Sequence, residues 1–214
     1  MATTSANAPI ADRLIGVYLD TLASAAPAPG GGSAAGVAGA LAAALTEMVC
    51  NITLSHDLPP TIDHELRSAR DEATSLRGHF LALGEEDEVA YRGYAAAVAM
   101  PKQTAEEKTA RRLTIQAALR EAAEAPLRLA ENCVALLDVL APVMRHGNTY
   151  VLSDAIIAIR LVEAAIAAAV LNVNANVRLM KNASDAAHYK HRIDELEHAA
   201  RATVATLLEI STTR

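Results

Sequence analysis

The sequence is poor in aromatic residues and in cysteine. It has no tryptophan and one phenylalanine, and aromatic residues make up 3% of its 214 residues although 52% are hydrophobic. The apolar content is therefore mainly Ala, Leu, Val and Ile, which suits closely packed helices. The two cysteines, Cys50 and Cys133, stand in separate apolar stretches without CxxC spacing. This indicates buried, reduced thiols and not a disulfide framework.

Basic stripes, metal-ligand spacings and a leader segment are also missing. The net charge of −6 argues against nucleic-acid binding. The seven histidines include no HExxH, and the one pair at close helical spacing, His188 and His191, is interpreted as surface residues, so we expect no metal. Met1 to Pro9 has neither a basic nor an apolar region, so we expect no signal peptide and a cytoplasmic protein.

A membrane helix is the main alternative for the most apolar stretch. Residues 33–54 are long enough to cross a bilayer and carry one charge, Glu47. They are built on Ala and Gly, however, without an aromatic belt or flanking Lys and Arg. A second apolar stretch, residues 155–177, contains Arg160 and Glu163. Both are therefore interpreted as buried helices of a soluble bundle, with no membrane contact.

The apolar periodicity predicts helices throughout. They are expected over residues 10–25, 34–54, 61–100, 104–140, 155–181 and 184 onward, with Gly84 kinking or dividing the third and Pro126 kinking the fourth. No strand pattern, repeat or linker is visible. The prediction is one all-α domain over residues 9–214, a bundle of about six to eight helices around the Ala/Gly-rich helix, after a disordered segment 1–8. Small residues on two faces favour a dimer.

The loop Pro27-Ala-Pro-Gly-Gly-Gly-Ser33 is the first candidate site. The prolines hold the backbone extended, and the glycines permit conformations that a Cβ would hinder. Ser33 is a suitable N-cap for a helix from Ala34, whose exposed N–H groups would favour an anion or a polar edge. A tight interhelical turn is the alternative. Small residues four apart, such as Gly32 and Gly36, predict close approach of another backbone.

Several polar residues do not fit a simple bundle, and each has a structural alternative. Asn172 and Asn176 share a helix face, where they either join helices or contact a ligand. Asp154 follows Ser153 at a helix start, which capping alone would explain. Asp87 lies in an acidic run that is either solvated or turned inward. Lys102, after Pro101, is either a solvent lysine or an anion anchor.

Taken in order, these segments resemble the cyclodeaminase/cyclohydrolase family. That family comprises stand-alone bacterial methenyltetrahydrofolate cyclohydrolases and the cyclodeaminase domain of formimidoyltransferase-cyclodeaminase. The resemblance covers about residues 12–182, and the similar segments are YLDTLASAAPAPGGGS, EEDEVAY, MPK, EEKTARR, IQAAL, GNTYVLSDA and LNVNANV.

The resemblance implies an all-helical homodimer that binds a tetrahydrofolate derivative as substrate, with no metal and no prosthetic group. The implied substrate-binding residues are Pro29, Gly30, Gly31, Gly32, Ser33, Lys102, Ser153, Asn172 and Asn176. Lys102 would meet the acidic glutamyl tail. The implied acid/base is either Asp87 or Asp154, with Asn148 or Asn172 orienting the water or the departing group.

Two reactions and two further alternatives remain open. A cyclohydrolase is favoured because no transferase domain accompanies the helical domain. The alternatives are a cyclodeaminase, a paralogue with another amidine-like substrate, and a non-catalytic folate-binding or scaffold protein.

Three positions depart from the family pattern: Ala28 in PAPGGGS, Glu88 in place of a small residue, and Tyr150 near an expected asparagine. They bear on the substrate more than on the fold.

Overall fold

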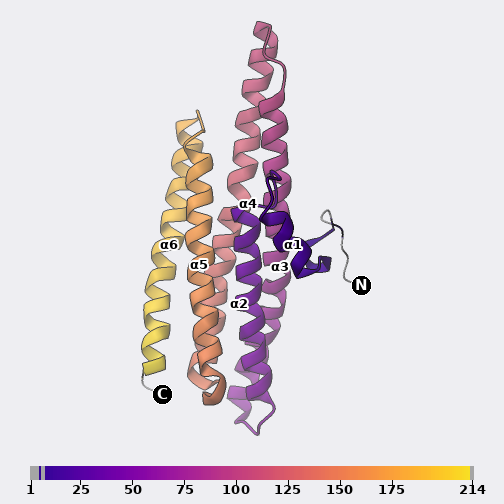
Figure 1. Ribbon diagram of the computed structural model, residues 1–214. Helices are drawn as coiled ribbons and strands as arrows, with labels where there is room; N and C mark the ends of the chain where they lie inside the picture. The colour runs from indigo at the N-terminus through magenta and orange to yellow at the C-terminus, as the bar shows by residue number, and fades with distance from the viewer. Residues whose placement is uncertain (1–4, 6–7, 213–214) are drawn as a thin grey trace.

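The computed structural model describes residue 5 and residues 8–212, and the all-α prediction is confirmed. The elements are η1 (Ile10–Asp12), α1 (Ile15–Leu22), α2 (Gly31–Leu54), α3 (Pro60–Ala99), α4 (Ala105–His146), η2 (Thr149–Val151), α5 (Leu152–Val177) and α6 (Ala183–Thr212) (Figure 1). The described residues contain six α-helices and no strand. Expected disorder over residues 1–8 falls mostly outside the described residues.

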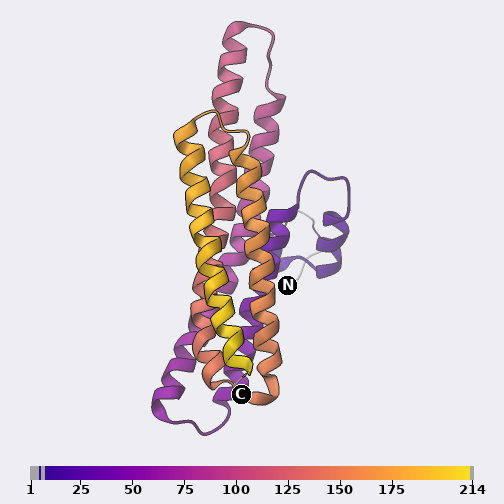
Figure 2. The ribbon, with the colours of Figure 1, turned by 90° about the vertical axis from the view of Figure 1, so that its left-hand side faces the viewer.

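The five long helices run side by side as an elongated bundle. α2 packs against α3, α4 and α5, whereas α6 covers α4 and α5 on the other side. α3 and α4 form a long hairpin whose tip projects beyond the other helices, while α1 stands off the side of the bundle (Figures 1 and 2). The N-terminus of α2 and the C-terminus of α5 therefore lie partway along the α3–α4 hairpin.

Small residues bring α2 and α3 together, as their spacing predicts. A Cβ on Gly36 would lie 2.6 Å from the carbonyl oxygen of Phe80, and one on Gly39 would overlap the Phe80 ring. Gly84 in turn lies against the backbone of Ser33. Gly84 does not divide the helix, because α3 runs unbroken from Pro60 to Ala99. Its missing side chain instead admits α2.

Two other helix boundaries differ from the prediction. α2 begins at Gly31 with Gly30 as N-cap, three residues earlier than expected, and Ser33 does not cap it. α4 continues through Pro126 as far as His146, beyond the expected end at Leu140. The predicted capping box at the start of α4 is confirmed, because Thr104 and Glu107 exchange both bonds. Packing on neighbouring helices evidently outweighs the hydrogen bond that Pro126 removes.

Both cysteines are free and buried, as predicted. Burial raises the pKa of Cys50 to about 12, so its thiol is inert at neutral pH.

By length and composition, α2 and the segment 149–177 could each cross a membrane, although the core helices of soluble bundles pass the same test. Each has one face in the core of this bundle.

Candidate functional site

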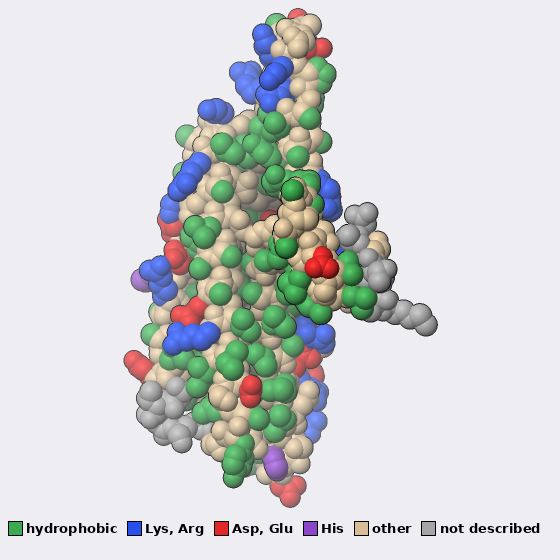
Figure 3. Space-filling view, in the orientation of Figure 1, with side chains coloured by type: hydrophobic (Ala, Val, Ile, Leu, Met, Phe, Trp, Pro, Cys, Tyr) green, Lys and Arg blue, Asp and Glu red, His purple; other side chains and the backbone are tan. Residues whose placement is uncertain are grey.

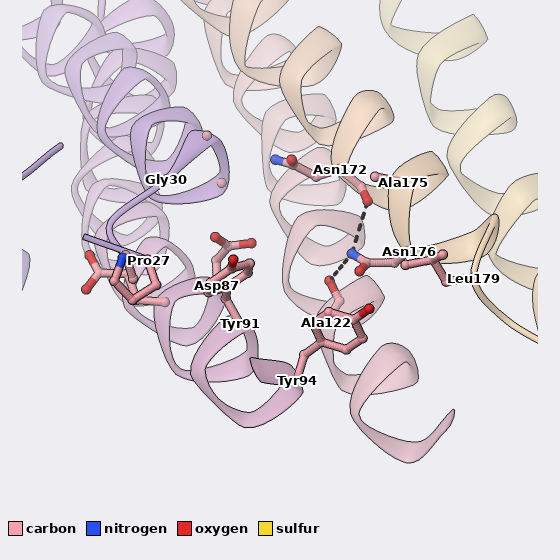
Figure 4. Close-up of a pocket in the computed structure, with 14 residues that line it drawn as sticks. Pro27, Gly30, Asp87, Tyr91, Tyr94, Ala122, Asn172, Ala175, Asn176 and Leu179 are labelled. Carbon is pink, nitrogen blue, oxygen red and sulfur yellow. Dashed lines mark hydrogen bonds between the residues drawn. The ribbon is translucent and has the colours of Figure 1, made fainter. Parts of the chain in front are cut away.

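A pocket of about 380 Å³ opens where the N-terminus of α2 faces α3, α4 and the end of α5. It brings together several of the residues predicted from sequence (Figure 4). Its lining consists of Pro27, Ala28, Gly30, Gly31, Gly32, Asp87, Glu88, Tyr91, Tyr94, Ala122, Asn172, Ala175, Asn176 and Leu179.

Two helices line the pocket with matching stripes. On α3, Asp87 is followed on the same face by Tyr91 and Tyr94, at spacings of four and three residues. On α5 and the turn after it, Asn172, Asn176 and Leu179 have the same spacing. The pocket is therefore polar at the Asp87 end and aromatic and apolar at the other end. Such a gradient suits an elongated ligand with a polar reacting group and an aromatic body.

Asp87 is the group best suited to chemistry. Its carboxyl group packs against Gly32, where an added Cβ would collide with it, and accepts a hydrogen bond from the Ser33 backbone N–H. Burial, followed by the nearby negative charge of Glu88, raises the pKa of Asp87 to about 6. The bond from Ser33 opposes this rise without cancelling it. A carboxyl group with a pKa close to neutrality is poised to take up and release a proton.

The neighbouring carboxylate, Glu88, has a different role. It is 3% exposed and accepts bonds of 3.1 Å from both terminal nitrogens of Arg13, whose side chain is 4% exposed. The Ser33 hydroxyl donates to the same carboxylate at 3.0 Å and lies 3.1 Å from the Tyr18 hydroxyl. Glu88 thus fastens η1, α1 and α2 to α3. Glu88, which stands where the family pattern has a small residue, is thus neutralised by Arg13.

The two asparagines of α5 are not equivalent. The Asn176 amide donates to the carbonyl oxygens of Ala122, at 2.8 Å, and Asn172, at 3.0 Å, so it joins α5 to α4. The Asn172 amide forms no hydrogen bond within the described part of the chain, and its oxygen lies beside Gly31 (Figure 4). The amide of Asn172 is thus the one available to a ligand.

The glycine loop contributes by proximity and not by unusual backbone angles. Among the described glycines none has a positive φ, contrary to the expectation that the loop uses such angles, although the Ala28–Pro29 peptide bond is cis. Gly31 and Gly32 form the first turn of α2. Their role is to let Asp87 approach the helix N-terminus, whose partial positive charge favours its ionised form.

Six predicted residues lie outside the pocket in this chain. Pro29 and Ser33 are buried beside it, and Lys102 is exposed at the tip of the α3–α4 hairpin. Asn148, Ser153 and Asp154 lie at the opposite end of α5, and a helical rise of 1.5 Å per residue puts Asp154 about 27 Å from Asn172. Asp87 and Asp154 of one chain are therefore too far apart to share a site. The predicted roles of the six residues outside the pocket stay predictions.

Asn148 builds the turn between α4 and α5. Its side chain accepts a bond from the Tyr150 N–H, and its own N–H donates to the Thr53 hydroxyl at 2.9 Å. Its amide nitrogen also lies 3.2 Å from His56. Tyr150 is 92% exposed beside this turn. The turn thus holds a polar, solvent-facing cluster far from the pocket of its own chain.

Sequence reasoning missed the apolar half of the pocket. Tyr91, Tyr94 and Leu179 were not singled out, although the tyrosines follow Asp87 at helical spacing in an otherwise aromatic-poor chain. That spacing is the signal that could have found them. The described residues contain no group of three or more His, Cys, Asp or Glu placed to hold a metal ion.

Comparison with known proteins gives matches over most of the chain. The formiminotransferase-cyclodeaminase family profile matches residues 14–195. A methenyltetrahydrofolate cyclohydrolase of Methylorubrum extorquens is 37% identical over 183 residues, 86% of each chain. The rat formimidoyltransferase-cyclodeaminase is 29% identical over 92% of this chain but only 36% of its own length.

A solved structure shows the same fold. Formiminotetrahydrofolate cyclodeaminase from Thermotoga maritima superposes with a TM-score of 0.84 at 23% identity, over 94% of this chain and 96% of that one. At this identity the likeness concerns the fold alone. Together with the match over residues 14–195 and the 37% identical relative, it leads to one conclusion: the chain belongs to the formiminotransferase-cyclodeaminase family.

Proposed function

We propose that this chain is a methenyltetrahydrofolate cyclohydrolase, which converts 5,10-methenyltetrahydrofolate and water to 10-formyltetrahydrofolate. The observation that carries the proposal is the Asp87 carboxyl group, with its pKa of about 6, at the polar end of a pocket of suitable size. The relative that matches over most of both chains has this activity in its name.

The pocket chemistry follows from the positions of its groups. The substrate's cationic amidinium carbon, between N5 and N10, would lie near the ionised Asp87, which stabilises the positive charge. Asp87 would accept a proton as a water oxygen bonds to that carbon, with Asn172 orienting the water. The proton would then pass to N5 as the carbon–N5 bond breaks, while the carbinol proton leaves to solvent and the formyl group stays on N10.

The other end of the pocket would hold the rest of the substrate. Tyr91, Tyr94 and Leu179 offer aromatic and apolar surface to the ring systems of a folate. Lys102 lies farther out on the α3–α4 hairpin, beyond the lining residues. Its proposed contact with a glutamyl tail therefore requires a substrate that extends along the hairpin.

The test is the loss of methenyl absorbance with purified protein, corrected for spontaneous hydrolysis. Asp87→Asn should lower kcat by a factor of about 10² or more, the usual contribution of a positioned acid/base. The exposed Asp138, on α4, supplies the control Asp138→Asn, which should match the wild type. Full activity of Asp87→Asn would refute the assigned role.

Ammonia-releasing cyclodeamination is the second candidate, because relatives of that name match over most of this chain. In that reaction N10 closes on a formimido carbon, and Asp87 would protonate the departing amine. Appearance of methenyl absorbance from 5-formimidotetrahydrofolate, without hydrolysis of the methenyl compound, would favour it. Inactivity with both substrates would leave the paralogue or the non-catalytic binding protein.

The relatives' names are those of metabolic enzymes, which supports a soluble protein. We also propose that it acts in the cytoplasm and uses neither a metal nor a prosthetic group. We further propose that it acts as a homodimer, as the small and apolar outer faces of α2 and α5 favour. Light scattering on the purified chain would test this. A monomer at micromolar concentration would contradict it.

A further inference from the structure

α2 and α5 each carry a second apolar face, turned away from the bundle core. On α5 it recurs every seven residues, a repeat typical of helix-to-helix seams. We define the α2–α5 face by Val37, Leu41 and Ala44 of α2 with Ile157, Ala164 and Leu171 of α5. Figure 3 shows hydrophobic side chains gathered over these helices. Leu41 is 54% exposed and Leu171 71%.

The size of this face suits a protein partner. Helices of 24 and 26 residues are about 36 and 39 Å long at 1.5 Å per residue. Two such helices packed roughly 9 Å apart present about 650 Å², or about 1,300 Å² when two copies meet. Specific interfaces bury about 1,200–2,000 Å² in total, and monomers rarely expose so large an apolar patch.

Polar groups mark the two ends of the face. Asp154 and Asn172 are 18 residues apart on α5, which is about five full turns, so they project from the same stripe. Asn172 borders the pocket at one end. At the other end, the Asp154 carboxylate forms no ion pair or hydrogen bond with any described residue, although the residue is partly buried.

We propose that a second copy of this chain docks antiparallel on the α2–α5 face and that each subunit's Asp154 completes the pocket of the other. A two-fold axis crossing α5 near Glu163, midway between Asp154 and Asn172, puts each Asp154 at the level of the partner's pocket. There its carboxylate faces the substrate's cationic carbon while Asp87 moves the proton. This inference rests on the proposed function and adds a second carboxylate to it.

A second copy fits this face better than a bilayer does. Arg160 and Glu163 form an ion pair of 2.7 Å midway along α5, and both side chains are solvent-accessible. Charges at mid-bilayer depth are costly, whereas the rim of a protein interface is commonly polar and charged. The end of α2 nearest the pocket also presents its positive dipole to an incoming Asp154.

Subunit complementation tests the composite site directly. Asp87→Asn and Asp154→Asn should each lose activity as homodimers. A hybrid of the two, purified through a different tag on each chain, would contain one pocket with both aspartates and recover about half of wild-type activity. If the pocket used both aspartates of one chain, the hybrid would stay inactive. Full activity of Asp154→Asn alone would also overturn the proposal.

Cross-linking tests the geometry without any activity assay. Ala164→Cys, close to the proposed axis, should form a disulfide-linked dimer under mild oxidation. Ile157→Cys should not, because a helical rise of 1.5 Å per residue puts it about 18 Å from its mate. Cross-linking of Ile157→Cys, or of neither variant, would overturn the antiparallel arrangement. A wild type without cyclohydrolase activity that cross-links as expected would refute only the proposed function.

Charge on the face provides the last test. Leu41→Glu should give folded monomers by light scattering, while Leu113→Glu, at an even more exposed position on α4 outside the face, should stay dimeric. Circular dichroism would verify the fold of both variants. A monomeric wild type that co-sediments with phospholipid vesicles would show a membrane as the occupant and overturn the proposal.

Discussion

Replacing Asp87 by Asn should remove activity and at the same time stabilise the protein at neutral pH. Burial and the charge of Glu88 raise the pKa of Asp87 from 3.8 to about 6, so folding disfavours its ionised form. At about 1.36 kcal/mol per pKa unit, the ionised carboxylate costs the folded state roughly 3 kcal/mol. Because the side chain partly faces the open pocket, we expect an observed gain of about 1–3 kcal/mol.

The sign of the pH dependence follows from the raised pKa. The contribution of Asp87 to stability is fully present below about pH 4, where the group is protonated in both states. It is lost as the pH rises through about 6. An asparagine does not titrate, so Asp87→Asn and the wild type should have similar free energies of unfolding near pH 4 and diverge up to pH 7.5.

Urea unfolding followed by circular dichroism at equal protein concentrations would measure both effects. Asp87→Asn should show a higher midpoint at pH 7.5 with an unchanged slope, and Tm should rise by roughly 2–10 °C for a domain of this size. Asp138→Asn, at an exposed position, should show neither change. A variant less stable than the wild type at pH 7.5 would refute the claim that Asp87 is held at an energetic cost.

Three further substitutions probe the same pocket, and a fourth serves as a control. The kcat/KM of hydrolysis should fall as the pH drops through about 6, where Asp87 becomes protonated. Glu88→Gln should shift this fall to lower pH, because the negative charge of Glu88 contributes to the raised pKa of Asp87. An unchanged pH profile in Glu88→Gln would contradict this coupling. Gly32→Ala should lower kcat at least tenfold by displacing the Asp87 carboxyl group, whereas Gly78→Ala, exposed on α3 outside the pocket and with nothing within 4 Å of the new methyl, should be nearly silent in the same assay. Asn172→Ala should lower kcat/KM about tenfold through loss of one hydrogen bond, and wild-type kinetics would exclude its contact with substrate.

The bundle could be predicted from the sequence because its periodicity and composition agree. Two adjacent stripes of small residues, which contain Gly36 and Gly39, indicated close packing, and α3 supplies the backbone and the Phe80 ring that lie against them. Predictions from single residues were less reliable. Ser33 is a favourable N-cap by type, yet Gly30 holds that position and the Ser33 hydroxyl binds Glu88 instead. Tertiary hydrogen bonds, which sequence cannot show, decided the outcome.

The distance between the two predicted carboxylates shows a second limit of sequence reasoning. Family resemblance groups Asp87 with Asp154 and Asn148 without specifying whether they belong to one subunit. Five turns of α5 separate Asp154 from the pocket, and no sequence periodicity distinguishes a bundle face that meets a second chain from one that meets lipid. A helix face as apolar as that of α5 is compatible with either environment.

The acidic run at 85–88 explains why Asp87, among four consecutive carboxylates, is the chemically available one. Successive helical residues point about 100° apart, so each carboxylate meets a different environment. Glu85 accepts a bond from a backbone N–H of η1, Glu86 pairs with an arginine of α4, and Glu88 pairs with the buried Arg13. Asp87 lines the pocket without an ion pair to any described residue, whereas Glu88, which also borders the pocket, is held by Arg13. The paired neighbours hold α3 in place, and burial together with the charge of Glu88 keeps the Asp87 proton exchangeable near neutral pH.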